Sequence, residues 1–387
     1  MGLRSTASFL ALVTSFCGVA CRDQPSRAEP ATDARTVIAA APADVTPAAP
    51  ADERGDAGGP PVRNDGTIFV DTEMMGTQVS INVYVGPDGD ARAAGRAVEA
   101  AFEEMSRIEG LLSEWRPQSE LSRLNRAAGG EPMRVSSELA EVLARSREIS
   151  EETDGHFDVT FHAVGQLWSF RPGATPPSKE AIEAELPLVD WRGIEVTRTP
   201  GGPSFARLAR PGMMVGLGAI GKGYAVQRAS EVLKSQGFHD HVVEAGGDTH
   251  AAGTKGGQPW MVGVQNPDEP GVLGVLPSSN RSVVTSGDYQ RFFDHEGKRY
   301  AHIIHPRTGW PIELESSPKS VTLVADGPTE GDAYCTAVVV MGAEAGMRFV
   351  ESKPDLQAII VTRSGELLIS SGLRDAFIAT TPQGKPL

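Results

Sequence analysis

Alternating apolar and polar residues predict strands early in the chain. Residues 79–85 read Val-Ser-Ile-Asn-Val-Tyr-Val, and the apolar stretch 68–70 precedes them. Successive side chains of a strand point to opposite faces, so this alternation is typical of a half-buried strand. Later strand patterns lie at 242–243, 260–264, 320–325 and 357–361.

Apolar residues at helical spacing predict helices among these strands. Val98, Phe102 and Met105 recur at such spacing within residues 93–112. The same spacing predicts further helices at 136–150, 223–236 and 331–342. Residues 172–210 are rich in proline, and we expect them to be peripheral. The pattern therefore indicates a body of mixed α and β structure.

The first twenty residues have the pattern of an export signal. A single charge precedes Arg22, and residues 7–20 form an apolar run of 14 residues. A membrane-spanning helix needs about 20 apolar residues, so the run is short for one and suits a signal peptide over 1–20. The stretch Gly18-Val19-Ala20-Cys21 is similar to a bacterial lipobox, in which Cys21 would carry the lipid. Ordinary signal cleavage is the alternative.

Composition separates a tether from the body. Residues 21–66 are rich in Ala, Pro, Asp and Arg and poor in residues that build a core, so we expect a disordered tether there and the folded body at 67–387. With 36 Lys and Arg against 50 Asp and Glu, the net charge is −14. This charge argues against binding to nucleic acid. Three cysteines, two of them in or next to the signal, do not suggest a disulfide scaffold.

Two glycine-rich segments are candidates for ligand binding. In residues 216–224, four glycines precede a predicted helix, and Lys222 lies at its start. Backbone N–H groups at a helix start, with a lysine, can bind a diphosphate; a plain tight turn is the alternative. The second segment is Glu244-Ala245-Gly246-Gly247-Asp248. Its glycines permit close approach of a ligand, and Asp248 could accept hydrogen bonds, but a capped turn fits equally well.

Polar residues gather again in residues 284–309. Thr285 and Ser286 are followed by Asp288 and Tyr289, and His302 and His305 come soon after. The histidine spacing weakly suggests zinc, but residues three apart on a strand point to opposite faces and no third ligand is near in sequence.

The predicted helix at 331–342 carries a possible metal site. Asp332 and Thr336 are four residues apart, so they share one helical face. Their oxygen atoms could bind Mg²⁺ or Ca²⁺ together with main-chain carbonyls. The alternative is that Asp332 caps the start of its own helix.

These segments, in this order, are together similar to the ApbE family of periplasmic FAD:protein FMN transferases, which move FMN from FAD onto a Thr or Ser of a target protein. Further matching segments are Met75-Gly76-Thr77, Leu112-Ser113-Glu114-Trp115, 119–125 and 154–160. The resemblance runs from about residue 70 to 350. It implies an α+β fold in which a single body of mixed sheets and flanking helices holds FAD in a central cleft.

Carried over position by position, the resemblance implies a set of site residues. Those expected around FAD are Met75, Trp115, Phe157, Asp158, Val159, Gly216, Lys222, Asp248, Thr285, Ser286 and Ile304. Mg²⁺ would be bound by Asp332, Thr336 and main-chain oxygens near Ala219 and Cys335. Lys222 would balance charge on the FAD diphosphate as AMP leaves. His302, with a pKa near neutrality, would act as the base.

Three positions depart from the family pattern. Gly216 and Gln227 stand where aspartate is common, and His305 replaces the aspartate of a His-x-x-Asp-Pro motif. These departures keep two alternatives open: a Mg²⁺-dependent FAD pyrophosphatase that releases FMN and AMP, and a non-catalytic FAD-binding lipoprotein. For the transferase, the resemblance suggests that the acceptor is a membrane redox subunit or an FMN-binding-domain protein. It places the chain on the periplasmic side of the envelope, held to a membrane by the lipid.

Overall fold

The computed structural model describes residues 59–289 and 291–380. The predicted signal peptide, Cys21 and the tether as far as residue 58 lie outside these described residues. Residues just before 67 already contact the body. Asp65 accepts a 2.7 Å hydrogen bond from the Thr67 hydroxyl and forms an ion pair with Lys255.

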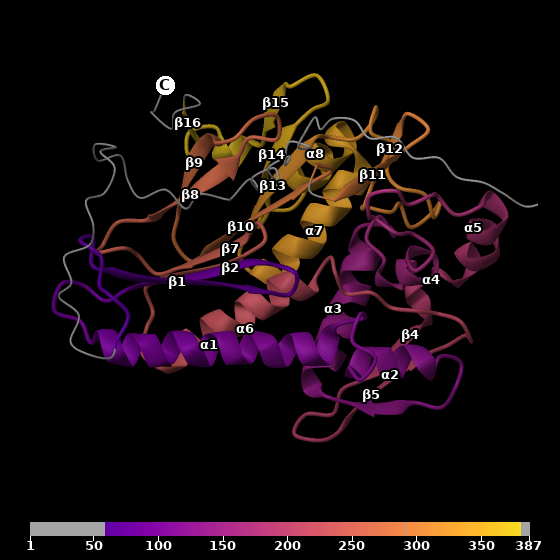
Figure 1. Cartoon of the computed structure of the whole chain (residues 1–387), viewed down its shortest axis with the longest axis horizontal. Helices are drawn as coiled ribbons and strands as arrows, with labels where there is room; N and C mark the ends of the chain where they lie inside the picture. The colour runs from indigo at the N-terminus through magenta and orange to yellow at the C-terminus, as the bar shows by residue number, and fades with distance from the viewer. Residues whose placement is uncertain (1–58, 290, 381–387) are drawn as a thin grey trace, which may run out of the picture. The chain divides into compact units, whose positions relative to one another are not determined.

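An antiparallel sheet of eight strands lies at the centre of the described chain (Figure 1). Its order is β1-β2-β6-β7-β10-β13-β14-β15, and each of its strand pairs is antiparallel. The strands are β1 (Thr67–Met74), β2 (Thr77–Tyr84), β6 (His241–Ala245), β7 (Asp248–Ala252), β10 (Arg281–Gly287), β13 (Ser320–Ala325), β14 (Gln357–Val361) and β15 (Leu367–Ile369).

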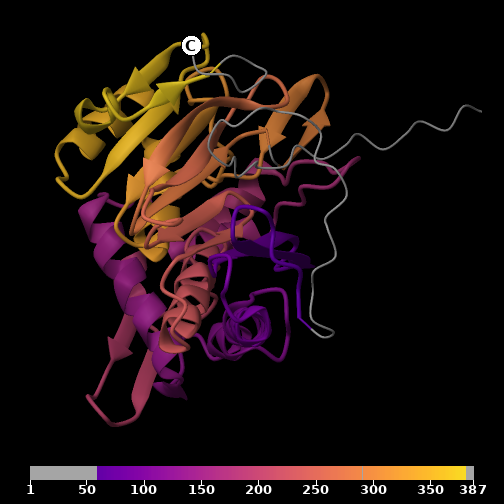
Figure 2. The same cartoon turned by 90° about the vertical axis from the view of Figure 1, so that its left-hand side faces the viewer.

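Helices cover one face of this sheet, and a small sheet covers the other (Figures 1 and 2). The covering helices are α1 (Ala91–Leu112), α6 (Gly221–Ser235) and α7 (Pro328–Met341). The small sheet is formed by β8 (Trp260–Gln265), β9 (Val272–Ser278) and β16 (Ile378–Ala379). Alternation along β10 builds both interfaces: Val284 packs into the helix-side core, whereas Val283 packs with Val262 and Leu276.

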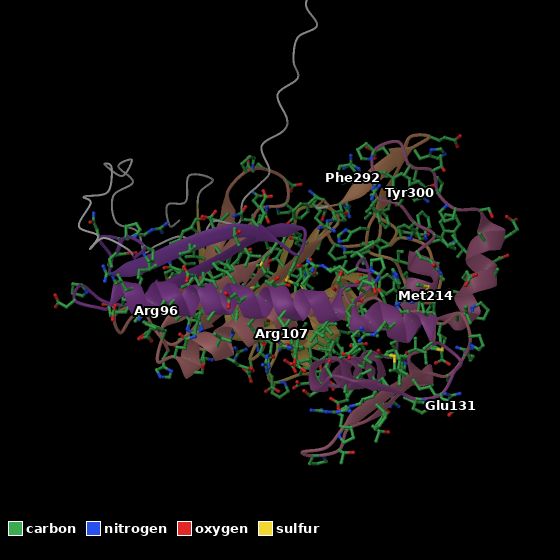
Figure 3. The ribbon with its side chains drawn as sticks, turned by 60° about the horizontal axis from the view of Figure 1, so that its bottom comes forward. Arg96, Arg107, Glu131, Met214, Phe292 and Tyr300 are labelled. Carbon is green, nitrogen blue, oxygen red and sulfur yellow. The ribbon has the colours of Figure 1, made fainter. Side chains whose placement is uncertain are left out.

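The remaining elements surround this body. The helices are α2 (Glu120–Arg126), α3 (Ser137–Glu152), α4 (His162–Gly165), α5 (Lys179–Glu185) and α8 (Ala343–Glu351). A three-stranded sheet contains β3 (Met133–Val135), β4 (Ile194–Thr197) and β5 (Ser204–Leu208), and a hairpin contains β11 (Phe292–His295) and β12 (Lys298–Ala301). Phe292 and Tyr300 lie on that hairpin (Figure 3). The predicted α+β class is confirmed.

The four predicted helices and all the predicted strands are present, with ends shifted by a few residues. Strand β7 was not predicted, and it follows a hairpin turn with positive φ at Gly246 (57°) and Gly247 (97°). One expectation was wrong. Residues 172–210 are not merely peripheral, because Ile194 and Leu208 are fully buried in the main core.

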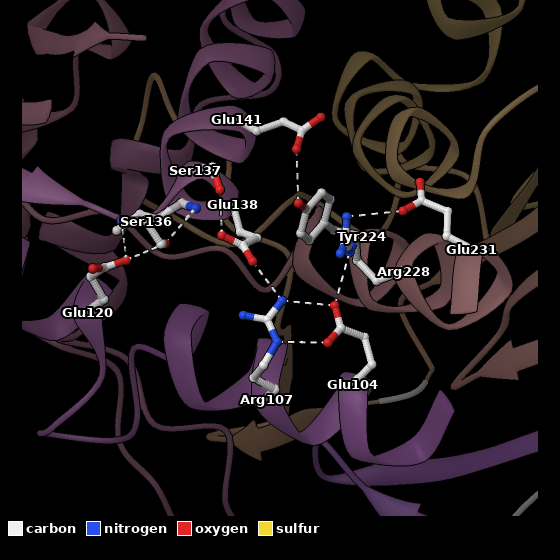
Figure 4. Close-up of polar contacts among 11 residues, drawn as sticks. Glu104, Arg107, Glu120, Ser136, Ser137, Glu138, Glu141, Tyr224, Arg228 and Glu231 are labelled. Atoms are coloured by element: carbon white, nitrogen blue, oxygen red, sulfur yellow. Dashed lines mark hydrogen bonds and ion pairs between the residues drawn. The ribbon is translucent and has the colours of Figure 1, made fainter. Parts of the chain in front are cut away.

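Polar contacts tie α6 to its neighbours (Figure 4). The guanidinium of Arg228 lies 3.1 Å from Glu104 of α1, which also pairs with Arg107. The buried Tyr224 donates a 3.0 Å hydrogen bond to Glu141 of α3. These contacts fix the first turns of α6, where Lys222 lies.

Among the described residues, no helix combines the length and apolar character that crossing a membrane requires.

The stability of the fold should depend on two buried histidines. His241 bonds through its ring to the Ser230 hydroxyl at 2.8 Å, and His250 bonds to the Ser282 hydroxyl at 2.9 Å. Burial lowers the pKa of His241 to about 4 and that of His250 to about 3. An unfolded histidine binds a proton below about pH 6.5, so the free energy of unfolding should fall as the pH drops from there.

Each histidine should lower the free energy of unfolding by up to about 1.4 kcal/mol for each pH unit below about 6.5, until the pH reaches the lowered pKa of that histidine. Urea unfolding from about pH 7.5 to about pH 5 measures this slope. His241→Asn should give a shallower slope than the parent protein. Parallel slopes would show that His241 is not held neutral by the fold.

Candidate active site

A lysine and two carboxylates form the most strongly charged buried cluster that we identify in the described chain. The Lys222 Nζ atom lies 2.9 Å from Asp248 Oδ2 and 3.1 Å from Asp332 Oδ1. The side chains are 27%, 3% and 2% exposed, respectively. They come from the first turn of α6, the start of β7 and the second turn of α7. The fold therefore unites three segments that sequence reasoning singled out separately.

A glycine allows α6 and α7 to approach so closely. A Cβ atom at Gly223 would lie 2.1 Å from the Pro328 carbonyl oxygen, so any side chain would collide with the backbone of α7. The Gly223 N–H donates a 3.1 Å hydrogen bond to Asp332 Oδ2. Asp332 does not cap its own helix, because α7 begins at Pro328. It caps α6 instead, whose own N-terminal residue provides no side-chain cap.

The electrostatics of the cluster favour a bound cation. Burial by itself lowers the pKa of Lys222, but Asp248 and Asp332 outweigh it and raise that pKa above its ordinary value. Burial, followed by the charge of Asp332, raises the pKa of Asp248 well above its usual range. Asp248 Oδ2 is buried, and the ammonium of Lys222 is its contact at 2.9 Å. Two carboxylates thus share one ammonium, so the cluster carries a net negative charge when both carboxylates are ionised.

The predicted metal ligands fit Mg²⁺ only with help from further oxygen atoms. Thr336 lies on α7 one turn after Asp332. The Cys335 thiol is buried and donates hydrogen bonds to carbonyls of β10 and β13, so only its main chain could serve a cation. Burial raises the pKa of Cys335 to about 12. Ala219 lies in the turn before α6.

Within the described ranges, no group of three or more His, Cys, Asp or Glu side chains could hold a metal. Mg²⁺ commonly uses one or two carboxylates and takes its other oxygens from water and substrate phosphates. The donor set around Asp332 is of that kind.

Thr285 and Ser286 lie beside this cluster. On β10, the residue before Thr285 pairs with Asp248 of β7, and the Thr285 N–H donates to the Gly247 carbonyl at 3.0 Å. The Thr285 hydroxyl lies 2.9 Å from that of Thr322. The sheet therefore brings two predicted FAD residues next to Asp248.

The loop 157–159 positions the glycine-rich turn. Phe157 and Val159 are buried in the main core, and the Val159 carbonyl accepts a 2.9 Å hydrogen bond from the Gly216 N–H. A Cβ at Gly216 would lie 3.0 Å from the ring of His162. Sequence reasoning missed His162, because its packing against Gly216 arises only in the folded chain.

Asp158 has a structural role within the same loop. Its carboxylate accepts hydrogen bonds from the Thr160 N–H at 2.8 Å, the Thr160 hydroxyl at 2.6 Å and the Trp191 N–H at 3.1 Å. Burial raises the pKa of Asp158. The chain itself thus uses most of the hydrogen-bonding capacity of this side chain.

The other predicted FAD residues occupy contrasting environments. Trp115 is 78% exposed, which is unusual for so large an aromatic side chain. Met75 forms the β1–β2 turn with Gly76, and both have positive φ (54° and 69°). Ile304 is buried in an aromatic cluster that includes Phe293 and Trp168.

His302 differs electrostatically from the sequence-based expectation. Burial, followed by the charge of Arg291, lowers the pKa of His302 to about 4, so the expected value near neutrality was wrong. Its Nδ1 lies 3.2 Å from the Arg291 carbonyl oxygen. A carbonyl only accepts, so Nδ1 carries the proton and Nε2 is left as an acceptor. The charge of Lys222 also lowers this pKa, which shows that His302 lies within electrostatic range of the cluster.

His305 and Gln227 replace expected aspartates and have local roles. The Arg307 N–H donates to His305 Nδ1 at 3.2 Å, which is how an aspartate would cap the same turn. Gln227 of α6 accepts a 2.6 Å hydrogen bond from the Thr329 hydroxyl of α7. Both substitutions thus keep structural contacts near the site.

An open apolar groove of about 610 Å³ lies elsewhere, between α8 and β15. None of the predicted site residues lines it. The candidate site is therefore defined by its buried polar cluster.

Comparison with known proteins identifies the family of the chain. Residues 75–360 match the ApbE family. The chain belongs to the ApbE family. It is 30% identical over 307 residues to an FAD:protein FMN transferase of Klebsiella pneumoniae, covering 79% of this chain and 92% of the relative. It is 32% identical to the Treponema pallidum FAD:protein FMN transferase, covering 78% of this chain and 86% of the relative.

Solved ApbE structures share the fold. The ApbE protein of Thermotoga maritima has a TM-score of 0.71 at 30% identity, covering 80% of this chain and 99% of that one. The flavin transferase ApbE of Vibrio cholerae has a TM-score of 0.69 at 28% identity, with the same coverage of each chain.

Removal of the Lys222 ammonium should be costly in this ApbE family member. Lys222→Met leaves Asp248 and Asp332 buried without a counter-charge. Removing one partner of a buried ion pair typically lowers the free energy of unfolding by about 3–5 kcal/mol. Urea unfolding in the presence of EDTA measures the loss. The control is Arg299→Met, which removes an exposed pair with Asp294 and should cost at most about 1 kcal/mol. Similar losses in both variants would contradict the described cluster.

Proposed function

We propose that this chain is an FAD:protein FMN transferase that moves FMN from FAD to a Thr or Ser hydroxyl of a target protein and releases AMP. The observation that carries the proposal is the buried cluster of Lys222, Asp248 and Asp332 at the start of α6. Its place in an ApbE family fold, and the activity named for the relatives, support the same assignment.

Lys222 would act on the diphosphate of FAD. Its raised pKa keeps the ammonium charged throughout the physiological range. The N–H groups in the first turn of α6 add positive potential at the same place. Together they would stabilise the negative charge that builds on the phosphates as AMP leaves.

The proposal includes a Mg²⁺ ion held by Asp332, Thr336 and main-chain oxygens near Ala219 and Cys335. The available donors are oxygens, and two carboxylates that share a single ammonium leave the cluster suited to additional positive charge. When bound, the ion would neutralise negative charge on the phosphates of FAD.

His302 would receive the proton of the acceptor hydroxyl. A new bond forms between that hydroxyl oxygen and the FMN phosphorus, and the bond from this phosphorus to the AMP oxygen breaks. His302 is neutral at pH 7, and its Nε2 is the free acceptor. A lowered pKa makes it a weak base, so positioning and electrostatics would supply most of the acceleration.

The proposal also places the protein outside the cytoplasm. The apolar run at 7–20 and the lipobox-like stretch ending at Cys21 support export and a lipid anchor on the periplasmic side of a membrane. An acceptor in the same compartment follows, either a membrane redox subunit or an FMN-binding-domain protein.

Intact-mass spectrometry of a candidate FMN-binding-domain protein tests the activity. Incubation with the chain, FAD and Mg²⁺ should add the mass of one FMN unit. EDTA and Asp332→Ala should each abolish the gain, because EDTA removes the cation and the substitution removes one of its proposed ligands. Release of free FMN and AMP without a gain would indicate the pyrophosphatase. FAD retained unchanged would indicate a binding protein.

The pH profile of transfer tests the base. Because the pKa of His302 is lowered to about 4, the rate should not fall with a midpoint near 6.5, where an ordinary histidine titrates. His302→Gln should lower the transfer rate by about 10²–10⁴-fold and leave FAD binding nearly unchanged. An unchanged rate in that variant would remove His302 from the mechanism.

A further inference from the structure

His162 is a buried polar side chain whose ring has no hydrogen-bond partner that we identify in the described chain. It begins α4 and is only 7% exposed. The buried rings of His241 and His250 each bond to a serine hydroxyl, as buried polar groups normally do. Burial lowers the pKa of His162 to about 4. The ring is therefore neutral at pH 7, with one N–H donor and one nitrogen acceptor left unused.

The ring of His162 lies beside the most exposed large aromatic residue among those described. Its centroid is 6.0 Å from that of Trp115, and the two planes meet at 84°. Trp115 is 78% exposed, so its faces are available to a planar ligand. A ring stacked on Trp115 would present its polar edge near the imidazole.

The same ring fills the space above the glycine-rich turn. A Cβ at Gly216 would lie 3.0 Å from His162 Cβ and Cγ, and 3.1 Å from Nδ1. The turn from Gly216 leads directly to Lys222 at the start of α6. His162 thus supplies a polar side chain at a point where the turn carries none.

We propose that His162 is an FAD-contacting residue of this chain, which hydrogen-bonds the edge of a planar FAD ring lying against Trp115. This inference rests on the proposed function. FAD has two such rings, adenine and isoalloxazine, and both present donor and acceptor atoms along one edge. A neutral imidazole can match either edge.

Titration of FAD into the purified protein, followed by flavin fluorescence, tests the contact without any turnover. His162→Phe keeps an aromatic ring but removes the hydrogen bond, and should weaken FAD binding about tenfold. The matched control is His250→Asn, which changes a buried histidine on β7 and should leave the affinity unchanged. Thermal unfolding without FAD confirms that each variant is folded.

Separate titrations with ADP and with FMN show whether His162 contacts the adenine ring or the isoalloxazine ring of FAD. His162→Phe should weaken the binding of one of them and spare the other. Equal loss for both would indicate a general loosening of the site and would overturn the inference. Unchanged FAD affinity would also overturn it, while transfer by the parent protein would leave the proposed function intact. A parent protein that binds no FAD would overturn both.

A reciprocal substitution adds a second readout. Gly216→Asp should weaken FAD binding at least about tenfold, because a Cβ there lies 3.0 Å from His162 and the imidazole must shift from the proposed contact to make room. His162→Gly removes that crowding, so the double variant should bind FAD more tightly than Gly216→Asp alone. Additive losses would show that the two positions do not share one space, which would contradict the inference.

Discussion

The site depends on one buried ammonium that balances two buried carboxylates. Asp248 and Asp332 approach from β7 and α7, and without Lys222 between them their mutual repulsion would oppose the packing of α6. Gly223 permits that packing, because its missing side chain lets the backbone of α6 meet the start of α7. Charge balance and close backbone contact are thus satisfied at the same point, and this point becomes the start of a helix where phosphate can bind.

Much of the fold could be predicted from hydrophobic periodicity. Helix α1 has a clean apolar face, and β13 and β14 have the predicted bounds, because local patterns encode these elements. Strand β7 was missed because its sequence, Asp-Thr-His-Ala-Ala, contains no apolar alternation, although all five residues are buried. Its strand conformation comes from pairing with β6 and β10 on either side, which is tertiary information.

The residue types of the candidate site could be predicted from the sequence, but most contacts between these residues could not. The spacing of Asp332 and Thr336 correctly placed both on one helix, but only the fold shows that Asp332 caps α6. The pKa of His302 depends on burial and on Arg291, neither of which its neighbours in sequence reveal. His162 escaped notice for the same reason. Local sequence patterns identify the types of residue in the site, whereas residues distant in the chain determine the pKa values and hydrogen bonds of those residues.

In the proposed function, the Lys222 cluster is where the cation and the diphosphate of FAD bind together. Crystals grown with FAD and Mn²⁺ in place of Mg²⁺ test it directly, because anomalous scattering locates the metal without assumptions about its ligands. We expect a manganese peak within coordination distance of the Asp332 carboxylate and the Thr336 hydroxyl, with the FAD diphosphate beside Lys222. A peak elsewhere, or a diphosphate bound away from the start of α6, would contradict it.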